Sequence, residues 1–279
     1  MENSELMYKI VKDKDAYYSS YNIKKKNGEL RLIENPKDEL KTIQRELLDR
    51  MLRHIKIDKN VHGFVENRGI YTNVALHVGA VCVVHLDLKD FFHTVTKEKI
   101  IKELGRFVRT PNAIAELATY KERLPQGSPT SPCISNIVCV RMDRKLGGLA
   151  KRFNAVYTRY ADDITFSSKT NKDLHKIIPK AHSFIKGEGF ELNYKKTRVM
   201  RKGCRQIVTG LTVNSKVNVP RARVRNFRAE LHQTHLSGTK DDYLTIQQLK
   251  GFNAFIMGAN KNKGIKFAEK IDKMVKDVA

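Results

Sequence analysis

The sequence predicts an α+β fold whose last part is entirely helical. Short apolar runs rich in β-branched residues alternate with helical periodicities as far as Pro220. Three helical segments then close the chain, at 221–236, 242–257 and 262–277, and they are separated by Ser237-Gly238-Thr239 and Gly258-Ala259-Asn260. Mixed strands and helices followed by a helical end indicate an α+β body with a small helical appendage.

The first predicted elements are a hairpin and helices. Lys24 to Pro36 is expected to pair across an Asn27-Gly28 turn, because Asn-Gly favours the tight turns of β-hairpins. A helix is expected from Asp38 to Ile55, and residues 97–120 are also expected to be helical. The apolar residues that share one face of the first helix are Leu40, Ile43, Leu47, Leu48, Met51 and Leu52.

The later predicted strands end or turn at acidic residues. The run Val81 to Leu86 is typical of a buried strand, and it ends at Asp87. Val156 to Ser168 is expected to form two strands separated by Ala161-Asp162-Asp163, which puts two acids at a hairpin turn. A further hairpin is predicted from Gln206 to Val219.

The charge of the chain predicts a polyanionic partner. Its 279 residues include 53 Lys plus Arg against 30 Asp plus Glu, a net charge of +23. From Glu191 to Arg228 there are eleven Lys or Arg and one acid. Nucleic acid is favoured over a membrane surface, because Gly203, Gly210 and Pro220 interrupt this segment and prevent one long amphipathic helix. A generally basic protein without such a partner is the alternative.

Other features of the sequence predict a cytoplasmic protein with no membrane partner. No apolar run reaches the ~18 residues of a membrane helix, and Met1 to Asp15 lacks the apolar stretch of a secretory signal. The cysteines lie far apart, which is typical of a protein from a reducing compartment. They are Cys82, Cys133, Cys139 and Cys204.

The acids at the predicted strand ends are candidate metal ligands. Phosphoryl transfer to a nucleotide uses two divalent cations about 3.5–4 Å apart, and Mg²⁺ takes oxygen ligands. Asp87, Asp162 and Asp163 would supply three carboxylates from adjacent strand ends. An Asp-Asp pair is also ordinary in a turn, so these acids alone leave both interpretations open.

Motifs around these acids identify a family. In chain order they are Asp87-Leu88-Lys89-Asp90-Phe91-Phe92, Leu124 to Pro132 (LPQGSPTSP), Tyr160-Ala161-Asp162-Asp163 and Gly189 to Thr197 (GFELNYKKT). Together they closely resemble the motif series of reverse transcriptases, from the palm metal strand through the YxDD turn to the downstream lysine loop. Lys24 to Pro36 resembles the fingers hairpin that precedes them. The resemblance runs from about residue 20 to residue 220.

The resemblance implies a right-hand polymerase with a small helical thumb. It assigns residues 1–80 to the fingers, with 107–125 returning to them, 81–106 and 126–214 to the palm, and 215–279 to the thumb. Pro220 suits the first turn of the first thumb helix. Because the chain after Pro220 has room only for the thumb, we expect none of the maturase and DNA-binding segments of group II intron enzymes.

The resemblance also implies catalytic roles. Asp87, Asp162 and Asp163 would be the metal ligands, and Leu88 would add its backbone carbonyl. The expected cofactor is a pair of Mg²⁺ ions, with Mn²⁺ as a possible substitute. Lys196, or alternatively Lys195, would protonate the pyrophosphate leaving group.

Residues of the nucleotide pocket follow from the same motifs. Lys25, or alternatively Lys26, and Arg31 would reach the triphosphate of the incoming dNTP. The expected lining residues are Asp90, Phe92, Gln126 and Gly127, and Gly127 would permit close approach of the backbone. In this motif Phe92 would lie under the sugar and clash with a 2′-hydroxyl, which favours deoxynucleotides. The alternative is that Phe92 is simply a core residue.

Further motifs resemble those of bacterial retron reverse transcriptases. Val61-His62-Gly63-Phe64 followed by Asn73-Val74-Ala75-Leu76-His77 resembles their insertion, although Val74 stands where Ala is usual. Val208-Thr209-Gly210 matches the retron VTG motif, which is linked to recognition of the cognate RNA. We therefore expect RNA-binding roles for Asn73, His77, Val208, Thr209 and Gly210, and for Arg221 and Arg225 on the first thumb helix. Asn73 and His77 could instead cap or pack, if helical.

The function implied by the resemblance is that of a retron enzyme. Such an enzyme is an RNA-directed DNA polymerase that copies a cognate noncoding RNA, priming from an RNA 2′-hydroxyl. Its product is branched multicopy single-stranded DNA, and it acts in anti-phage defence with an effector protein encoded nearby. The alternatives are another bacterial defence-associated or group-II-related reverse transcriptase, or a catalytically silent RNA-binding scaffold.

Overall fold

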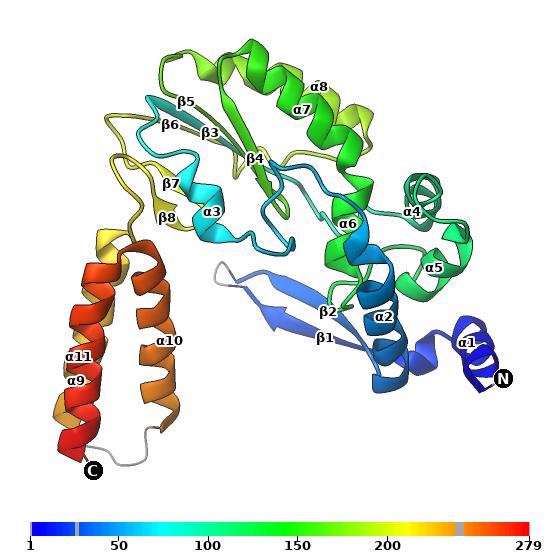
Figure 1. Ribbon diagram of the computed structural model, residues 1–279, viewed down its shortest axis with the longest axis horizontal. Coiled ribbons are helices and arrows are strands. Elements are labelled where there is room, and N and C mark those ends of the chain that lie inside the picture. The colour runs from blue at the N-terminus through cyan, green and yellow to red at the C-terminus, as the bar shows by residue number, and fades with distance from the viewer. Residues whose placement is uncertain (1, 26–27, 238–242, 279) are drawn as a thin grey trace.

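The chain adopts the right-hand arrangement expected from the motifs (Figure 1). The computed structural model describes residues 2–25, 28–237 and 243–278. A four-stranded sheet forms the centre, a hairpin with helices lies below it, and three long helices form a separate bundle at one side in this view. Lys26 and Asn27 of the predicted hairpin turn, and Gly238 and Thr239 between the last helices, lie outside the described residues.

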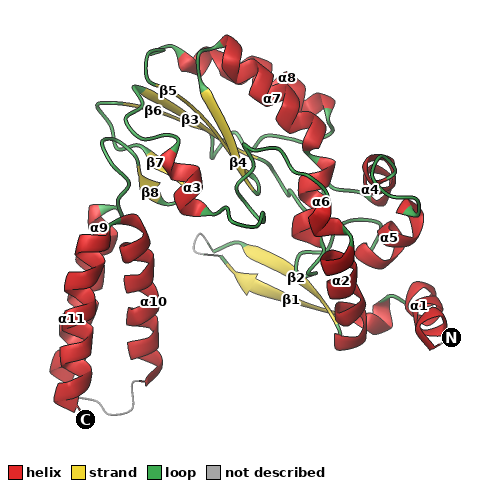
Figure 2. Ribbon diagram, viewed as in Figure 1, coloured by secondary structure: helices red, strands yellow, loops and turns green. Residues whose placement is uncertain are grey.

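The central sheet is antiparallel, with strand order β4-β5-β3-β6. Helices α7 (Val140–Arg152) and α8 (Ile178–Gly187) cover one face of it (Figure 2). Alternate strand residues, such as Leu86 and Phe166, pack into a core shared with Leu146 and Ile185 of these helices. The strands are β3 (Cys82–Asp87), β4 (Val156–Tyr160), β5 (Asp163–Ser168) and β6 (Arg198–Arg201). The predicted strands β3, β4 and β5 are confirmed, and β6 was not predicted.

The hairpin of β1 (Tyr18–Lys24) and β2 (Leu30–Pro36) is confirmed, and it is longer than expected. It packs near the helices α1 (Glu2–Lys12), α2 (Asp38–Arg50) and α5 (Pro111–Ala118). The small core of this region consists of Ile10, Tyr18, Leu40, Leu117 and Tyr120. Residues 107–125 thus return to the region of the hairpin. The short 3-10 turn Asp15–Tyr17 leads into β1.

Two predicted helices differ in extent from the structure. Residues 97–120 form two helices, α4 (Lys97–Leu104) and α5, because Gly105 caps the first and Pro111 starts the second. The helix predicted from Asp38 ends at Arg50, and a 3-10 turn, Leu52–His54, follows it. After the LPQGSP loop, α6 (Ser131–Val138) runs into α7, and a 3-10 turn, Leu174–Ile177, precedes α8.

The three predicted C-terminal helices are confirmed as α9 (Arg221–Ser237), α10 (Tyr243–Ala259) and α11 (Lys261–Val278). They share a second core with the short hairpin of β7 (Ile207–Val208) and β8 (Leu211–Thr212). The short helix α3 (Ile70–Ala75) joins this contact, since the Tyr71 hydroxyl donates a 3.0 Å hydrogen bond to the Phe255 carbonyl. None of the described helices is both long and apolar enough to cross a membrane.

Candidate active site

The predicted metal ligands meet at one end of the central sheet. Asp87 is the last residue of β3, Asp163 is the first of β5, and the antiparallel register pairs them directly. Directly opposed residues have Cβ atoms about 4.5–5.5 Å apart. Asp162 precedes Asp163 in the turn, and its carbonyl accepts a 3.1 Å hydrogen bond from the Leu88 N–H. The sheet therefore gathers three acids from segments 75 residues apart in the chain.

The proximity of these acids changes their ionisation. Burial, followed by the charges of Asp162 and Asp87, raises the pKa of Asp163 to about 7. Burial also raises the pKa of Asp162, and the charge of Asp87 adds to that rise. Like charges held together in a partly buried site favour a cationic partner.

Lys196 supplies one such positive charge. Its Nζ lies 3.0 Å from each carboxylate oxygen of Asp87. Burial acts to lower the pKa of Lys196, but the hydrogen bond to Asp87 and the charges of the three acids outweigh it and raise this pKa. The loop is fixed by a 2.8 Å hydrogen bond from the Asn193 N–H to the Asp87 carbonyl. Lys195 is exposed and has no ion pair with the described residues, so Lys196 is the lysine brought to the acids.

The donor set fits a divalent cation. Asp87 is only 3 % exposed, and its Oδ1 accepts no well-formed hydrogen bond from the described residues although Lys196 lies nearby. One ligand atom from each of His85, Asp87 and Asp163 lies within 4.8 Å of the others. Carboxylate oxygens suit Mg²⁺, whereas an imidazole nitrogen does not. The carboxylates are therefore better suited than His85 to hold such an ion.

Three aromatic rings form a row beside the acids. The Phe92 ring centroid lies 6.3 Å from that of Phe64, and Phe64 lies 6.4 Å from Tyr160 of the YADD turn. Phe92 is half-buried and also packs against Phe91, whereas Phe64 is 47 % exposed. Phe92 is therefore neither fully core nor fully open, which suits a residue at the wall of a pocket. Asp90 is exposed, has a positive φ of 46°, and accepts hydrogen bonds from Thr94 through its carbonyl.

The fingers hairpin contacts the loop that carries Gln126 and Gly127. The Glu34 N–H of β2 donates a 2.9 Å hydrogen bond to the Gln126 carbonyl. Gly127 has φ +147°, and a Cβ there would lie 2.8 Å from the Glu34 carbonyl oxygen, so only glycine allows this approach.

The two cations of the hairpin differ in their surroundings. Arg31 is exposed on β2, and its positive charge counteracts the raised pKa of Asp162, which indicates that it faces the acids. Lys25 forms a 3.1 Å ion pair with Glu29 instead.

The VTG motif adjoins the acids through a basic cavity of about 620 Å³. Thr209 and Gly210 line this cavity together with His85, Asp163, Arg198 and Arg205. Thr209 and Gly210 both have positive φ, at 41° and 81°, so they form a tight turn between β7 and β8. Val208 is buried in the second core, so its side chain does not reach the cavity, and its RNA-binding role stays a prediction.

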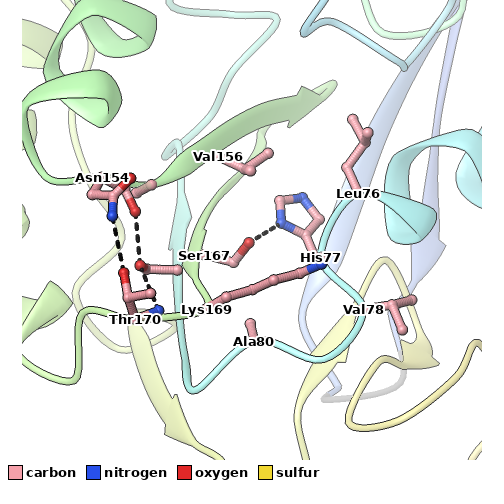
Figure 3. Close-up of a pocket in the computed structure, with 11 residues that line it drawn as sticks. Leu76, His77, Val78, Ala80, Asn154, Val156, Ser167, Lys169 and Thr170 are labelled. Carbon is pink, nitrogen blue, oxygen red and sulfur yellow. Dashed lines mark hydrogen bonds between the residues drawn. The ribbon is translucent and has the colours of Figure 1, made fainter.

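Asn73 and His77 support this region from the inside. Asn73 is buried and donates a 3.3 Å hydrogen bond to the Thr209 hydroxyl, which links the two retron-like motifs. His77 is 1 % exposed. One of its ring nitrogens lies 2.7 Å from the Ser167 hydroxyl (Figure 3), and the other lies 2.7 Å from the Thr158 hydroxyl. Burial lowers the pKa of His77 to about 3, so the ring is neutral. Both side chains are therefore packed inside the protein, which was the alternative interpretation, and their RNA-binding roles stay predictions.

The arginines of α9 fall into two groups. Arg221 and Arg225 are exposed and form no ion pair with the described residues. Arg223 lies 5.1 Å from the ring centroids of both Phe252 and Phe255, so it is engaged within the bundle. Arg228 lies over the Phe267 ring in the same way, so Arg221 and Arg225 are the exposed arginines of α9 that contact no ring of the described residues.

Sequence reasoning missed several residues beside the acids. His85 lies two positions before Asp87 on the same strand, so the two side chains share one face. Strand periodicity alone was the signal that could have found it. Phe64 gave no such signal, because its place beside Phe92 depends on the fold of a loop.

The known proteins that this chain resembles in sequence are reverse transcriptases. The family described as "Reverse transcriptase (RNA-dependent DNA polymerase)" matches residues 23–240. The chain is 36 % identical to the retron Mx162 and Mx65 reverse transcriptases of Myxococcus xanthus, over 94 % and 93 % of its length. It spans 62 % and 65 % of those two proteins. It is 30 % identical to the retron Ec86 reverse transcriptase of Escherichia coli, covering 98 % of this chain and 86 % of that one.

Solved structures support the fold. A foamy viral protease-reverse transcriptase in complex with double-stranded DNA superposes with a TM-score of 0.54 at 14 % identity, over 94 % of this chain and 43 % of that one. The telomerase of Candida albicans gives a TM-score of 0.52 at 10 % identity, over 92 % of this chain and 59 % of that one. With the family match over most of its length and the retron relatives, the chain belongs to the reverse transcriptase (RNA-dependent DNA polymerase) family.

Proposed function

We propose that this chain is an RNA-directed DNA polymerase of the retron type. The observation that carries the proposal is the meeting of Asp87, Asp162 and Asp163 at one end of the central sheet, with Lys196 hydrogen-bonded to Asp87. A site of this kind suits nucleotidyl transfer, in which negative charge builds up on the phosphoryl oxygens. The retron relatives, aligned over most of the chain, support the subtype.

The proposed metal ligands are the three carboxylates and the Leu88 carbonyl. Two bound Mg²⁺ ions, or Mn²⁺ in their place, would activate the primer hydroxyl and neutralise the triphosphate. The pKa of Asp163, raised to about 7, agrees with a site built for added positive charge. Lys196 is the proposed donor of the proton that the pyrophosphate takes as it leaves, because its Nζ faces the acids.

The proposed dNTP pocket lies between the hairpin and the acids. Arg31 and Lys25 of the hairpin would hold the triphosphate, and Lys25 would exchange Glu29 for phosphate. Asp90, Phe92, Gln126 and Gly127 would line the pocket. We retain the division into fingers at 1–80 and 107–125, palm at 81–106 and 126–214, and thumb at 215–279. The shared core of Ile10, Tyr18 and Leu117 supports the return of 107–125 to the fingers.

The proposed nucleic-acid partner is a cognate noncoding RNA and its RNA–DNA product. The basic cavity at Thr209 and Gly210 opens beside Asp163, which would bring an RNA hydroxyl close to the site of nucleotide addition. We include in the proposal priming from a 2′-hydroxyl, multicopy single-stranded DNA as the product, and anti-phage defence with an effector encoded nearby. The free thiols of all four cysteines agree with a cytoplasmic location.

Co-expression with the native flanking DNA tests the retron subtype. The protein would be purified and its bound nucleic acid run on a denaturing gel before and after RNase. We expect a discrete DNA band that shifts on RNase treatment and is absent from an Asp162→Asn variant. Untemplated or repetitive DNA would favour another defence-associated type. RNA alone in both proteins would favour a silent scaffold.

Phe92→Ala is expected to weaken discrimination against ribonucleotides. A ring under the sugar opposes a 2′-hydroxyl by steric clash, and a clash of ~1–3 kcal/mol corresponds to a discrimination of about 5- to 160-fold. The ratio of kcat/KM for dNTP and rNTP measures the effect. Phe107→Ala is the matched control, since Phe107 is an exposed phenylalanine that lies on none of the motifs. An unchanged ratio in the Phe92 variant would remove this residue from sugar selection.

Arg221→Gln with Arg225→Gln is expected to reduce the salt dependence of nucleic-acid binding. Each phosphate neutralised contributes about −0.9 to the log–log slope on B-form duplex, so loss of two contacts should flatten the slope by about 1.8. Titrations of a primer–template duplex at several salt concentrations measure it. The control is Arg144→Gln with Arg152→Gln. These two exposed arginines belong to α7, a helix that packs on one face of the central sheet and lies away from α9. Equal slopes for the two double variants would contradict the contact.

A further inference from the structure

An arginine is completely buried beneath the catalytic turn. Arg159 of β4 and Asp143 of α7 are both 0 % exposed. Arg159 donates from Nε and from Nη2 to the two carboxylate oxygens of Asp143, each at 2.7 Å, which is the two-pronged geometry of strong Arg–carboxylate pairs. The Tyr157 hydroxyl donates to the same carboxylate at 2.6 Å.

The remaining arm of Arg159 reaches the turn that carries the metal ligands. Its Nη1 donates at 3.1 Å to the carbonyl of Ala161, the residue immediately before Asp162. It also donates at 3.0 Å to Asn136 Oδ1 of α6. Ala161 has φ +56°, a backbone conformation that costs an ordinary residue free energy and persists only when its surroundings impose it.

The same network holds a second segment against the turn. Asn136 Nδ2 donates at 2.8 Å to the Gly63 carbonyl, and the His62 N–H donates at 2.8 Å to the Arg159 carbonyl. A Cβ on Gly63 would lie 2.6 Å from the Ala161 nitrogen, so the VHGF segment lies directly on the turn. The turn is therefore enclosed between Arg159 and residues 61–64.

Stability alone does not account for this arrangement. Removing two charges from water costs several kcal/mol per ion, and replacing a buried pair by apolar residues of similar size is often neutral or stabilising. The fold could therefore use an apolar cluster at this place. What an apolar cluster cannot do is donate a hydrogen bond to the Ala161 carbonyl from a fixed position.

We propose that Arg159 is a positioning residue that holds the Ala161-Asp162 turn in the conformation required for metal binding. Asp143 orients the guanidinium, and Asn136 couples it to the VHGF segment. The inference rests on the proposed function, because it takes the acids of this turn as metal ligands. The Arg159 guanidinium would contact neither nucleotide nor metal, and it would act through its hydrogen bond to the backbone of the turn.

A matched pair of variants separates positioning from stability. In the first, Arg159→Met, Asp143→Leu and Tyr157→Phe together replace the buried charges and the hydroxyl bound to them with apolar groups, so that neither charge is left unpaired. The Ala161 carbonyl and Asn136 Oδ1 lose their hydrogen bonds from Arg159 in this variant. In the second, Arg159→Lys keeps the charge beside Asp143 but loses the fork that reaches Ala161 and Asn136 at once. Lys145→Met is the control. Lys145 is an exposed residue of α7, the helix that also carries Asp143, and it forms an ion pair with Glu188 at the end of α8.

Mn²⁺ binding is a readout that does not depend on turnover. It is measured from the electron paramagnetic resonance signal of the free ion. Asp162→Asn with Asp163→Asn supplies the background from other sites. Residues that orient metal ligands typically contribute 10–100-fold in metal affinity, so we expect each Arg159 variant to bind Mn²⁺ at least about tenfold more weakly. The affinity of each folded variant for an RNA–DNA duplex should stay near that of the wild type, whereas Arg159→Lys is expected to lower the thermal midpoint, because buried hydrogen bonds are lost. Lys145→Met should match the wild type in Mn²⁺ affinity, duplex affinity and thermal midpoint.

Wild-type Mn²⁺ affinity in a folded Arg159 variant would overturn the inference. If the triple variant does not fold, Arg159→Lys alone decides. Failure of the proposed function has a different signature, because wild-type protein would then neither bind Mn²⁺ above the background variant nor extend a primer on RNA.

Discussion

Asp162→Asn with Asp163→Asn is expected to abolish DNA synthesis and, at the same time, to stabilise the metal-free protein. Loss of two carboxylate ligands removes transition-state stabilisation of several kcal/mol, which corresponds to at least about a 10³-fold loss of rate. Single-nucleotide incorporation on an RNA template measures this loss. Asp173→Asn is the control, because Asp173 is an exposed acid whose one ion pair within the described part of the chain is with Lys176.

The stability effect has a definite sign. The pKa of Asp163 is about 7 in the folded protein against an ordinary value of 3.8. As pH rises from about 4 to 7 the unfolded carboxyl ionises before the folded one, so the acid progressively destabilises the fold over this interval. In metal-free buffer at pH 7 or above, the thermal midpoint of the double variant should therefore exceed that of the wild type. A lower midpoint together with lost activity would mean that the acids are structural.

Lys196→Met is expected to give the second largest loss, about 10²–10³-fold in the rate of the chemical step, which is the usual contribution of a positioned general acid. The reason is the position of Nζ, which lies 3.0 Å from Asp87, beside the proposed site of nucleotidyl transfer. Single-turnover incorporation at saturating dNTP measures the step without product release.

Lys195→Met is the matched control, since it removes the same charge from the adjacent, exposed position. Its rate should remain close to that of the wild type. Because Lys196 also faces the three acids, the Mg²⁺ dependence of both variants should be recorded. If raising or lowering the Mg²⁺ concentration restored the Lys196 variant to the full rate, proton donation would be contradicted and only an electrostatic role would remain.

Much of the fold could be predicted because local patterns carry it. The apolar run ending at Asp87, the paired strands around Asp162-Asp163 and the three closing helices all depend on periodicity and turn chemistry, which act over a few residues. The three acids could likewise be located from motif spacing. The break within 97–120 was missed although Gly105 and Pro111 signal it, because the apolar periodicity continues on both sides.

The remaining features depend on contacts between distant segments. Asn73 and His77 carry the polarity expected of an RNA-binding pair, but their partners are hydroxyls 136 and 90 or 81 residues away, which no local pattern reveals. Arg159 likewise resembles any strand arginine until α7 brings Asp143 beside it. Polar residues at buried positions are therefore where the sequence is least informative.

The three acids are expected to add deoxynucleotides under the direction of an RNA template. The most direct measurement supplies purified protein with a primer annealed to RNA, Mg²⁺ and one dNTP at a time, and follows extension by a single nucleotide. We predict extension only with the dNTP complementary to the template, and none by the Asp162→Asn, Asp163→Asn variant. Extension that ignores the template base, or equal extension by the variant, would contradict the account.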